Sequence, residues 1–248
     1  VLEKGIKGII REIDESLKIH KKQEETDFLN GVRKVAETLI EWAHICSQKA
    51  AMLAAEVTDT EHKENLIRLS KALLNVPENK PSGFYEAVLS IYVCFSADPD
   101  SVGTLDRYLT PFYRYDIENG IISCEDAKEY LQELFLMIQA ATNAKDFRFT
   151  RGGESHFCIG GYLADGSDGF NELSHLIVES LMELPTYIPQ VTLRWTEKTP
   201  HEALRFMMNA ERNDKNKRIA FTNDEKRIKC YTEICGIPYE RAVSYTMV

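Results

Sequence analysis

Apolar residues recur at helical spacing through the first 140 residues of the chain. Near the N-terminus Ile6, Ile9, Ile13 and Leu17 lie three to four positions apart, with charged residues between them. A longer stripe begins near Asp27 and runs toward Glu56, through Phe28, Val32, Val35, Leu39, Trp42 and Ile45. The pattern predicts two amphipathic helices, the second unusually long.

Cap and breaker residues divide the remainder of this helical region. Thr58 and Glu61 have capping-box spacing and predict the start of a third helix. Ser82 is expected to cap a helix from Gly83 to about Phe95, after a connector that contains two prolines. The polar residues 96–103 are expected to form a loop. Two further helices are predicted, one over 104–119 with Pro111 inside it and one that begins at Ser123 and Asp126.

From about residue 150 short β-like runs alternate with helical patterns. Strands are predicted at 155–162, 190–195 and 218–222, and another β-like run at 244–248. Helices are predicted between them, at 171–184, after Thr199, and at 224–235. Thr199, Pro200 and Glu202 are expected at the N-cap, N1 and N3 positions of the second helix. Asp224 is expected at the N-cap or N1 position of the third, which Gly236 ends. Such an alternation favours parallel strands with helical crossovers. We therefore expect one incomplete domain over 1–248, mostly helical over 1–145, with part of an α/β barrel or sheet over 150–248.

Composition is that of a globular protein and narrows the choice of partners. Hydrophobic residues make up 44% and charged residues 28% of the chain, and the formal net charge is −9. No run of Lys and Arg exceeds two residues, which argues against nucleic acid and anionic membranes as partners. The longest nearly apolar run, 87–97, is too short to span a bilayer. The chain shows no signal peptide, so a cytoplasmic protein with reduced thiols is expected.

Candidate chemistry is sparse when each residue is considered alone. The six cysteines form no CxxC pair, and neither HExxH, a P-loop nor GxGxxG is present. His156 lies on a predicted parallel strand, where a histidine is either fixed by a hydrogen bond or faces a cavity. His156 and Cys158 supply at most two metal ligands, so no metal site is expected. The pairs Gly152-Gly153 and Gly160-Gly161 serve either turns or a close approach to a ligand.

Six ordered stretches carry more information than any single residue. They are PSGFYEAVLSIYVCF (81–95), GTLDRYLTPFYRYDIENGIISCEDAKEYLQELF (103–135), GGESHFCIGGYLADGSDGFNELSHLIVES (152–180), PQVTLRW (189–195), IAFTNDEKRIKCY (219–231) and GIPYERAVSYTMV (236–248). In this order they resemble the glycyl radical enzymes of the pyruvate formate-lyase-like group, in the branch of dehydratases and decarboxylases. The resemblance extends over nearly the whole chain. One departure is Thr104, where the family usually has Gly-Arg in GTLDRYL.

The resemblance implies a fold and a chemistry. It implies a ten-stranded α/β barrel inside a helical layer, of which this chain would form a part. Relatives use a cysteine thiyl radical that a backbone glycyl radical generates, and a radical AdoMet activating enzyme installs the glycyl radical. The implied reaction is hydrogen-atom abstraction from a small organic substrate, followed by elimination or C–C cleavage. No bound cofactor is expected, and a homodimer is a possible assembly.

The resemblance also defines which site residues this chain can supply. In relatives the stretch like RAVSYTMV leads into a Gly-Cys pair and a catalytic Glu, which lie beyond Val248, as does the glycine loop. No catalytic residue is therefore expected within the chain, and by itself it is expected to be inactive. Ser101, His156 and Cys158 match positions that contribute to the substrate pocket in relatives. They are the predicted substrate-binding residues.

Two other interpretations stay open at this point. The chain could be a non-catalytic remnant or scaffold that keeps the helical layer to bind partners, with exposed sheet edges that favour association. It could also be part of a metal-dependent barrel enzyme. The gene sequence beyond Val248 and metal analysis would separate these from a glycyl radical lyase or dehydratase.

Overall fold

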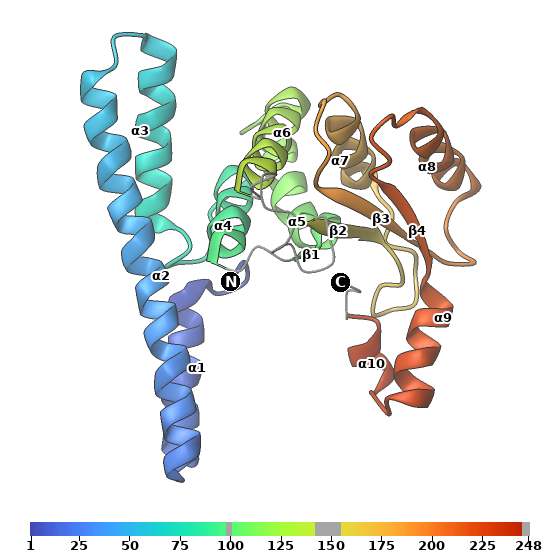
Figure 1. Cartoon of the computed structure of the whole chain (residues 1–248), viewed down its shortest axis with the longest axis horizontal. Helices are drawn as coiled ribbons and strands as arrows, with labels where there is room; N and C mark the ends of the chain where they lie inside the picture. Colours follow the sequence, from blue (N-terminus) through green and yellow to red (C-terminus); the bar gives the residue numbers. More distant parts are fainter. Residues whose placement is uncertain (98–100, 142–154, 245–248) are drawn as a thin grey trace. The chain divides into compact units, whose positions relative to one another are not determined.

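The computed structural model describes residues 1–97, 101–141 and 155–244. The chain divides into two compact units, Val1–Ala97 and Asp98–Val248. Each is described by itself (Figure 1).

The described part of the first unit is helical, as the apolar periodicity predicts. Its helices are α1 (Gly5–Ile19), α2 (Gln23–Glu56), α3 (Thr60–Asn75) and α4 (Phe84–Ala97). α1 and α3 both pack along the long helix α2 (Figure 1). The core between α2, α3 and α4 contains Ala43, Ala72, Leu73, Val76, Leu89 and Val93.

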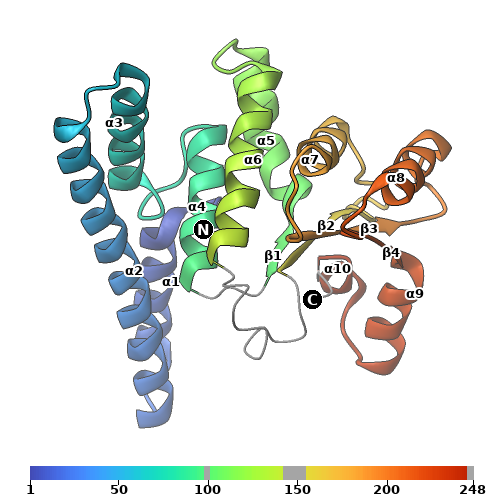
Figure 2. The ribbon, with the colours of Figure 1, turned by 45° about the horizontal axis from the view of Figure 1, so that its top comes forward.

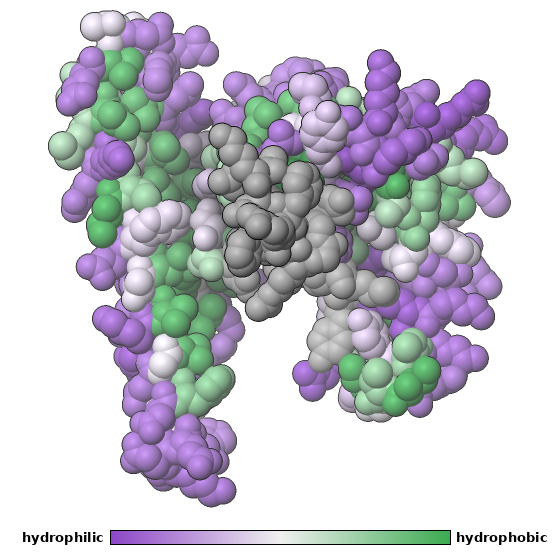
Figure 3. All heavy atoms as spheres, viewed as in Figure 1, coloured by the Kyte–Doolittle hydropathy of each residue, from purple (hydrophilic) through white to green (hydrophobic). Residues whose placement is uncertain are grey.

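The predicted apolar stripe of α2 is largely not the face that α2 buries. Phe28 is 70% and Val35 68% exposed within this structure. The buried positions of α2 are instead the small residues Ala43, Ser47, Ala50 and Ala54. Small side chains let α3 approach closely, and the hydroxyl of Ser47 donates a hydrogen bond to the Ser70 carbonyl at 2.7 Å. Apolar surface consequently shows along this unit in the space-filling view (Figure 3).

The described part of the second unit contains a four-stranded parallel sheet with the order β1-β2-β3-β4. The strands are β1 (Ser101–Thr104), β2 (His156–Gly160), β3 (Gln190–Trp195) and β4 (Ile219–Asn223). The helical elements are α5 (Leu105–Glu118), α6 (Cys124–Ala141), α7 (Glu172–Met182), α8 (His201–Asn213), α9 (Asp224–Lys229), the π-helix η1 (Cys230–Ile234) and α10 (Tyr239–Ala242). The βαβ succession with parallel strands is therefore confirmed.

Several element boundaries differ from the sequence-based expectations. β1 lies at the end of the stretch predicted as a loop, because its four residues gain their extended form by pairing with β2. Asp59, rather than Thr58, caps α3, and its side chain accepts a hydrogen bond from His62 N at 2.8 Å. Pro200, rather than Thr199, is the N-cap of α8. The helix predicted at 224–235 changes to π geometry at Cys230. The β-like run at 244–248 lies outside the described residues apart from Ser244.

The two faces of the sheet have different chemistry. One face carries the fully buried residues Phe157, Ile159, Val191 and Leu193. The ring of Phe157 stacks on that of Phe135 from α6, with centroids 5.5 Å apart and planes 8° from parallel. Figure 2 shows α5, α7 and α8 on one side of the sheet and α10 on the other. The helices α5 to α8 thus cover the apolar face, and α10 lies toward the opposite face.

Candidate functional site

Polar side chains line the sheet face that points away from α5 to α8. Successive side chains of a strand alternate between faces, and paired residues of parallel neighbours share one. The register pairs His156 with Gln190 and Cys158 with Thr192. It continues along β3 to Arg194, which pairs with Gly160 on one side and Thr222 on the other. Parallel sheets are usually apolar on both faces, so a face that carries His156, Cys158, Gln190, Thr192 and Arg194 is unusual. We call it the polar face and take it as the candidate site.

The three predicted pocket residues all belong to β1 and β2. Ser101 pairs with His156, and its hydroxyl donates a hydrogen bond to the His156 carbonyl at 3.0 Å. The same hydroxyl accepts a hydrogen bond from Gly103 N at 3.1 Å. His156 and Cys158 follow on the polar face. The structure brings the three residues together on adjacent strands, while their binding of a substrate stays a prediction.

Cys158 is buried, and its thiol is protonated at neutral pH. Burial raises the pKa of Cys158 to about 11, although the positive charges of Arg194 and Arg227 oppose that rise. A group in this state is neither a ready nucleophile nor a ready metal ligand, because both roles need the thiolate.

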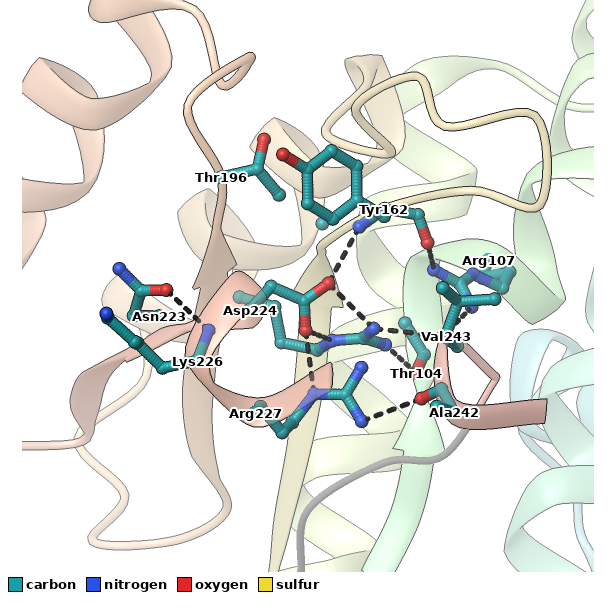
Figure 4. A network of polar contacts seen from close by, with 12 residues as sticks. Thr104, Arg107, Tyr162, Thr196, Asn223, Asp224, Lys226, Arg227, Ala242 and Val243 are labelled. Atoms are coloured by element: carbon teal, nitrogen blue, oxygen red, sulfur yellow. Dashed lines mark hydrogen bonds and ion pairs between the residues drawn. The ribbon is translucent and has the colours of Figure 1, made fainter. Parts of the chain in front are cut away.

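A buried ion pair stands at the carboxyl end of the polar face. Arg194 at the end of β3 donates from Nε to Asp224 Oδ1 at 2.9 Å and from Nη2 to Asp224 Oδ2 at 3.0 Å. Both side chains are fully buried. Asp224 is the first residue of α9, directly after β4, so the chain order β3, β4, α9 brings the pair together (Figure 4).

Asp224 has two further donors. Arg227, one turn along α9, donates from Nε to Oδ1 at 2.7 Å, and Tyr162 N donates to Oδ2 at 2.8 Å. Burial by itself would raise the pKa of Asp224, but the hydrogen bonds and charges of Arg194 and Arg227 outweigh it and lower that pKa. Asp224 is therefore ionised at neutral pH and holds two guanidinium groups in place.

The guanidinium groups also bind the end of the described chain. Arg194 Nη2 donates to the Val243 carbonyl at 3.0 Å, and Arg107 Nη1 donates to the same oxygen at 3.2 Å. Arg227 Nη1 donates to the Ala242 carbonyl at 3.1 Å. Figure 4 shows both carbonyls directed at this group of side chains. Arg107, Arg194, Arg227 and Asp224 are called the arginine cluster below.

Gly161 makes room for the arginine cluster. Its φ is +82°, and a Cβ there would lie 2.7 Å from Arg194 Nε. An alanine would thus both strain the backbone and collide with the guanidinium group. Gly160 also has a positive φ, of +70°, so both glycines have the backbone conformation of turns at a strand end, and the close approach of Gly161 is to a side chain of the protein. Gly152-Gly153 lies outside the described residues.

A second buried carboxylate, Asp106, ties the first turn of α5 to its neighbours. It accepts hydrogen bonds from Gly160 N at 2.8 Å, Ser174 Oγ at 2.6 Å and Arg107 N at 2.7 Å. Burial raises the pKa of Asp106 to about 6, although these hydrogen bonds oppose the rise. Its partners are all structural, so Asp106 joins β2, α5 and α7 behind the polar face.

The raised pKa of Asp106 has a consequence for stability. A carboxyl whose pKa is higher in the folded than in the unfolded state favours folding below the unfolded value and loses that contribution as the pH rises through the folded value. We expect the stability of Asp106→Asn relative to the wild type to increase between pH 4 and pH 7. Urea unfolding of both proteins at several pH values measures this difference, and a constant difference across the range would contradict it.

Sequence reasoning missed the arginine cluster. Asp224 is the first residue of α9, one of the two positions expected for it, and Asn223 is the N-cap, which accepts from Lys226 N at 2.9 Å. The available signal was an arginine inside the apolar strand stretch PQVTLRW, since a buried arginine requires a carboxylate partner.

Within 1–97, 101–141 and 155–244, no group of three or more His, Cys, Asp and Glu side chains could hold a metal ion. Among the same residues no helix is long and apolar enough to cross a membrane.

Comparison with known proteins places this geometry in a family. The family model "Pyruvate formate lyase-like" matches residues 1–248. Isethionate sulfite-lyase of Bilophila wadsworthia is 28% identical over 100% of this chain and 32% of its own length. The 4-hydroxyphenylacetate decarboxylase glycyl radical subunit of Clostridium scatologenes is 28% identical over 84% of the chain and 25% of its own length. The chain thus spans about a third of the length of these relatives, or less.

Solved structures agree with the sequence relatives. A glycyl radical enzyme from Archaeoglobus fulgidus superimposes with a TM-score of 0.85 at 25% identity, over 99% of this chain and 34% of that one. The expected α/β fold, a portion of a glycyl radical enzyme barrel with an N-terminal helical layer, is thereby confirmed. With a family model matched along its whole length, the chain belongs to the pyruvate formate lyase-like family of glycyl radical enzymes.

Proposed function

We propose that this chain is a portion of a glycyl radical lyase or dehydratase that acts on a small organic molecule. The observation that carries the proposal is the family match over all 248 residues. The relatives support the reaction class, since they include a sulfite-lyase, a decarboxylase and a trans-4-hydroxy-L-proline dehydratase.

The polar face is the part of this chain that we assign to the substrate pocket. His156, Gln190 and Thr192 are half-buried there and offer hydrogen-bonding groups to a hydroxyl or acid group of a substrate. Ser101 would act beside them, at the amino end of β1. A few such polar groups on a buried sheet suit a site that binds and orients a small polar molecule.

A larger barrel would complete this site. Among the described residues β1 and β4 pair with a neighbour on one side only, and unpaired strand edges are normally covered or paired. The radical cysteine and the glycine loop belong, in this proposal, to a longer gene product. The same proposal includes a radical AdoMet activating enzyme as partner, a homodimeric assembly and a cytoplasmic location.

Substrate consumption tests the proposal. The gene product that includes the sequence beyond Val248 would be activated anaerobically with a radical AdoMet activating enzyme. It would then be incubated with isethionate, 4-hydroxyphenylacetate, trans-4-hydroxy-L-proline, propane-1,2-diol and glycerol, the compounds that the relatives' names indicate. We expect loss of one small hydroxylated or acidic compound, with an elimination or C–C cleavage product detected by mass spectrometry.

The 248-residue chain, treated in the same way, is the control. We expect it to consume none of the compounds. Turnover by this chain alone, or an activated gene product that consumes no compound of these classes, would contradict the proposal.

A further inference from the structure

Side chains bind the carbonyls of Ala242 and Val243 at the end of α10. The last carbonyls of any helix lack partners inside the helix. Here the carbonyl oxygens of Ala242 and Val243 accept from Arg227, Arg194 and Arg107, at 3.1, 3.0 and 3.2 Å. Cations at a helix C-terminus are favourable, and here three guanidinium groups converge on two consecutive carbonyls.

The guanidinium groups are themselves fixed in position. Asp224 binds Arg194 through both carboxylate oxygens and Arg227 through one, so neither group is free to rotate. Arg107 is anchored separately, by donation from Nη2 to the Tyr162 carbonyl at 2.7 Å. Charge-assisted and bidentate hydrogen bonds add directional specificity as well as strength. The direction in which the chain leaves α10 is therefore determined by groups on β3, α5 and α9.

A second buried ion pair in the same unit shows what a purely structural pair looks like. Arg218 and Asp214 are each 2% exposed and lie 2.9 Å apart, close together in sequence. Arg218 Nη1 donates to the carbonyls of Leu181 and Leu184, at the end of α7. That pair balances one cation against one anion and braces a loop at the amino end of β4. In the arginine cluster, by contrast, Arg194 and Arg227 share Asp224, and together with Arg107 they donate to the carbonyls of Ala242 and Val243.

We propose that Arg194 is a positioning residue, which together with Arg107 and Arg227 fixes the Val243 carbonyl and so the course of the chain at Ser244. This inference rests on the proposed function, in which the chain beyond Ser244 leads to the reactive cysteine. Arg194 touches no reacting atom in this assignment. It acts through the backbone, by setting where that segment begins relative to the polar face.

One isotope-labelled peptide bond reports on this contact. The sequence contains a single Val-Ser dipeptide, Val243-Ser244. Cell-free synthesis of the 248-residue chain with 13C-carbonyl valine and 15N-serine therefore gives one signal in a 15N-edited carbonyl spectrum, from the carbonyl group that accepts from Arg194 and Arg107. A hydrogen bond moves such a carbonyl carbon downfield. In Arg194→Met we expect the signal to move upfield, and amide exchange of Val243 and Ser244 to become roughly tenfold faster, as the loss of a charged hydrogen bond implies.

Two further variants separate a local role from general destabilisation. Arg107→Met, which leaves the Arg194–Asp224 pair intact, should move the same signal upfield by a smaller amount. Arg218→Met destabilises the unit elsewhere and should leave the signal in place. An unmoved Val243 signal in folded Arg194→Met or Arg107→Met, or an equal shift in Arg218→Met, would overturn the assignment.

Activity distinguishes this inference from the proposed function. In the activated gene product, Arg194→Met is expected to keep the glycyl radical and lose substrate turnover. A wild-type gene product without turnover would defeat the proposed function, while the carbonyl signal would still decide the role of Arg194.

Discussion

Replacing Asp224 with Asn is expected to lower the free energy of unfolding of the second unit by ~3–5 kcal/mol, because it leaves buried guanidinium groups without their counter-charge. The amide keeps the shape of the carboxylate, but its nitrogen would face donors that Asp224 now accepts from, namely Arg194, Arg227 and the Tyr162 amide. Breaking one partner of a buried pair costs more than the pair contributes, since the remaining charge stays in a poorly solvating interior.

The measurement can be restricted to the second unit. The chain has two tryptophans, Trp42 in α2 and Trp195 at the end of β3. In a Trp42→Phe background, urea unfolding followed by fluorescence reports on Trp195 alone. Glu172→Gln is the control, because the Arg114–Glu172 pair is about half exposed and should contribute ~1 kcal/mol or less. Equal effects of Asp224→Asn and Glu172→Gln would contradict the assignment of a buried, charge-bearing cluster.

Phe157→Ala is expected to cost ~3–5 kcal/mol, the usual range for removing a buried phenylalanine side chain. Phe157 is inaccessible to solvent and stacks on Phe135, so its loss leaves a cavity between β2 and α6 that rigid neighbours cannot fill. The same Trp195 signal measures the change.

Phe221→Ala is the control, because it removes the same side chain as Phe157→Ala from a more exposed position. Phe221 lies on the edge strand β4 and is 39% exposed, so its truncation should cost much less. If Phe157→Ala lowers the free energy of unfolding by less than ~1 kcal/mol, the loss lies outside the range for truncating a buried aromatic side chain. That result would contradict the packing of the helices on the sheet.

Most elements of the second unit could be predicted from local signals. PQVTLRW combines β-branched and aromatic residues, and β3 has the predicted bounds, Gln190–Trp195. Gly236 follows the helical segment α9–η1 with φ +67°, a conformation that glycine adopts without strain. β1 could not be found in this way, because Ser101 to Thr104 have no periodic pattern and become a strand only by pairing with residues more than fifty positions away. The buried face of α2 was also not predicted, because small residues form it while larger apolar residues of the same helix lie exposed.

The candidate site was predicted in part. The resemblance pointed to Ser101, His156 and Cys158, and the structure places them on neighbouring strands, where their role in binding is still a prediction. The arginine cluster depends on five segments that meet only in the folded chain: the start of α5, the residues after β2, the end of β3, α9 and the end of α10. No spacing of residues in the sequence indicates that these five segments come together. A buried arginine in a strand indicates that a partner exists but does not identify it.

Electron paramagnetic resonance after anaerobic activation tests the central claim most directly, since it detects the glycyl radical itself. The 248-residue chain and the gene product that includes the sequence beyond Val248 would be treated side by side with a radical AdoMet activating enzyme. We expect a glycyl doublet from the longer gene product and none from the 248-residue chain. A doublet from the 248-residue chain, or a gene product that yields no glycyl radical, would contradict the claim that this chain is one portion of a glycyl radical enzyme.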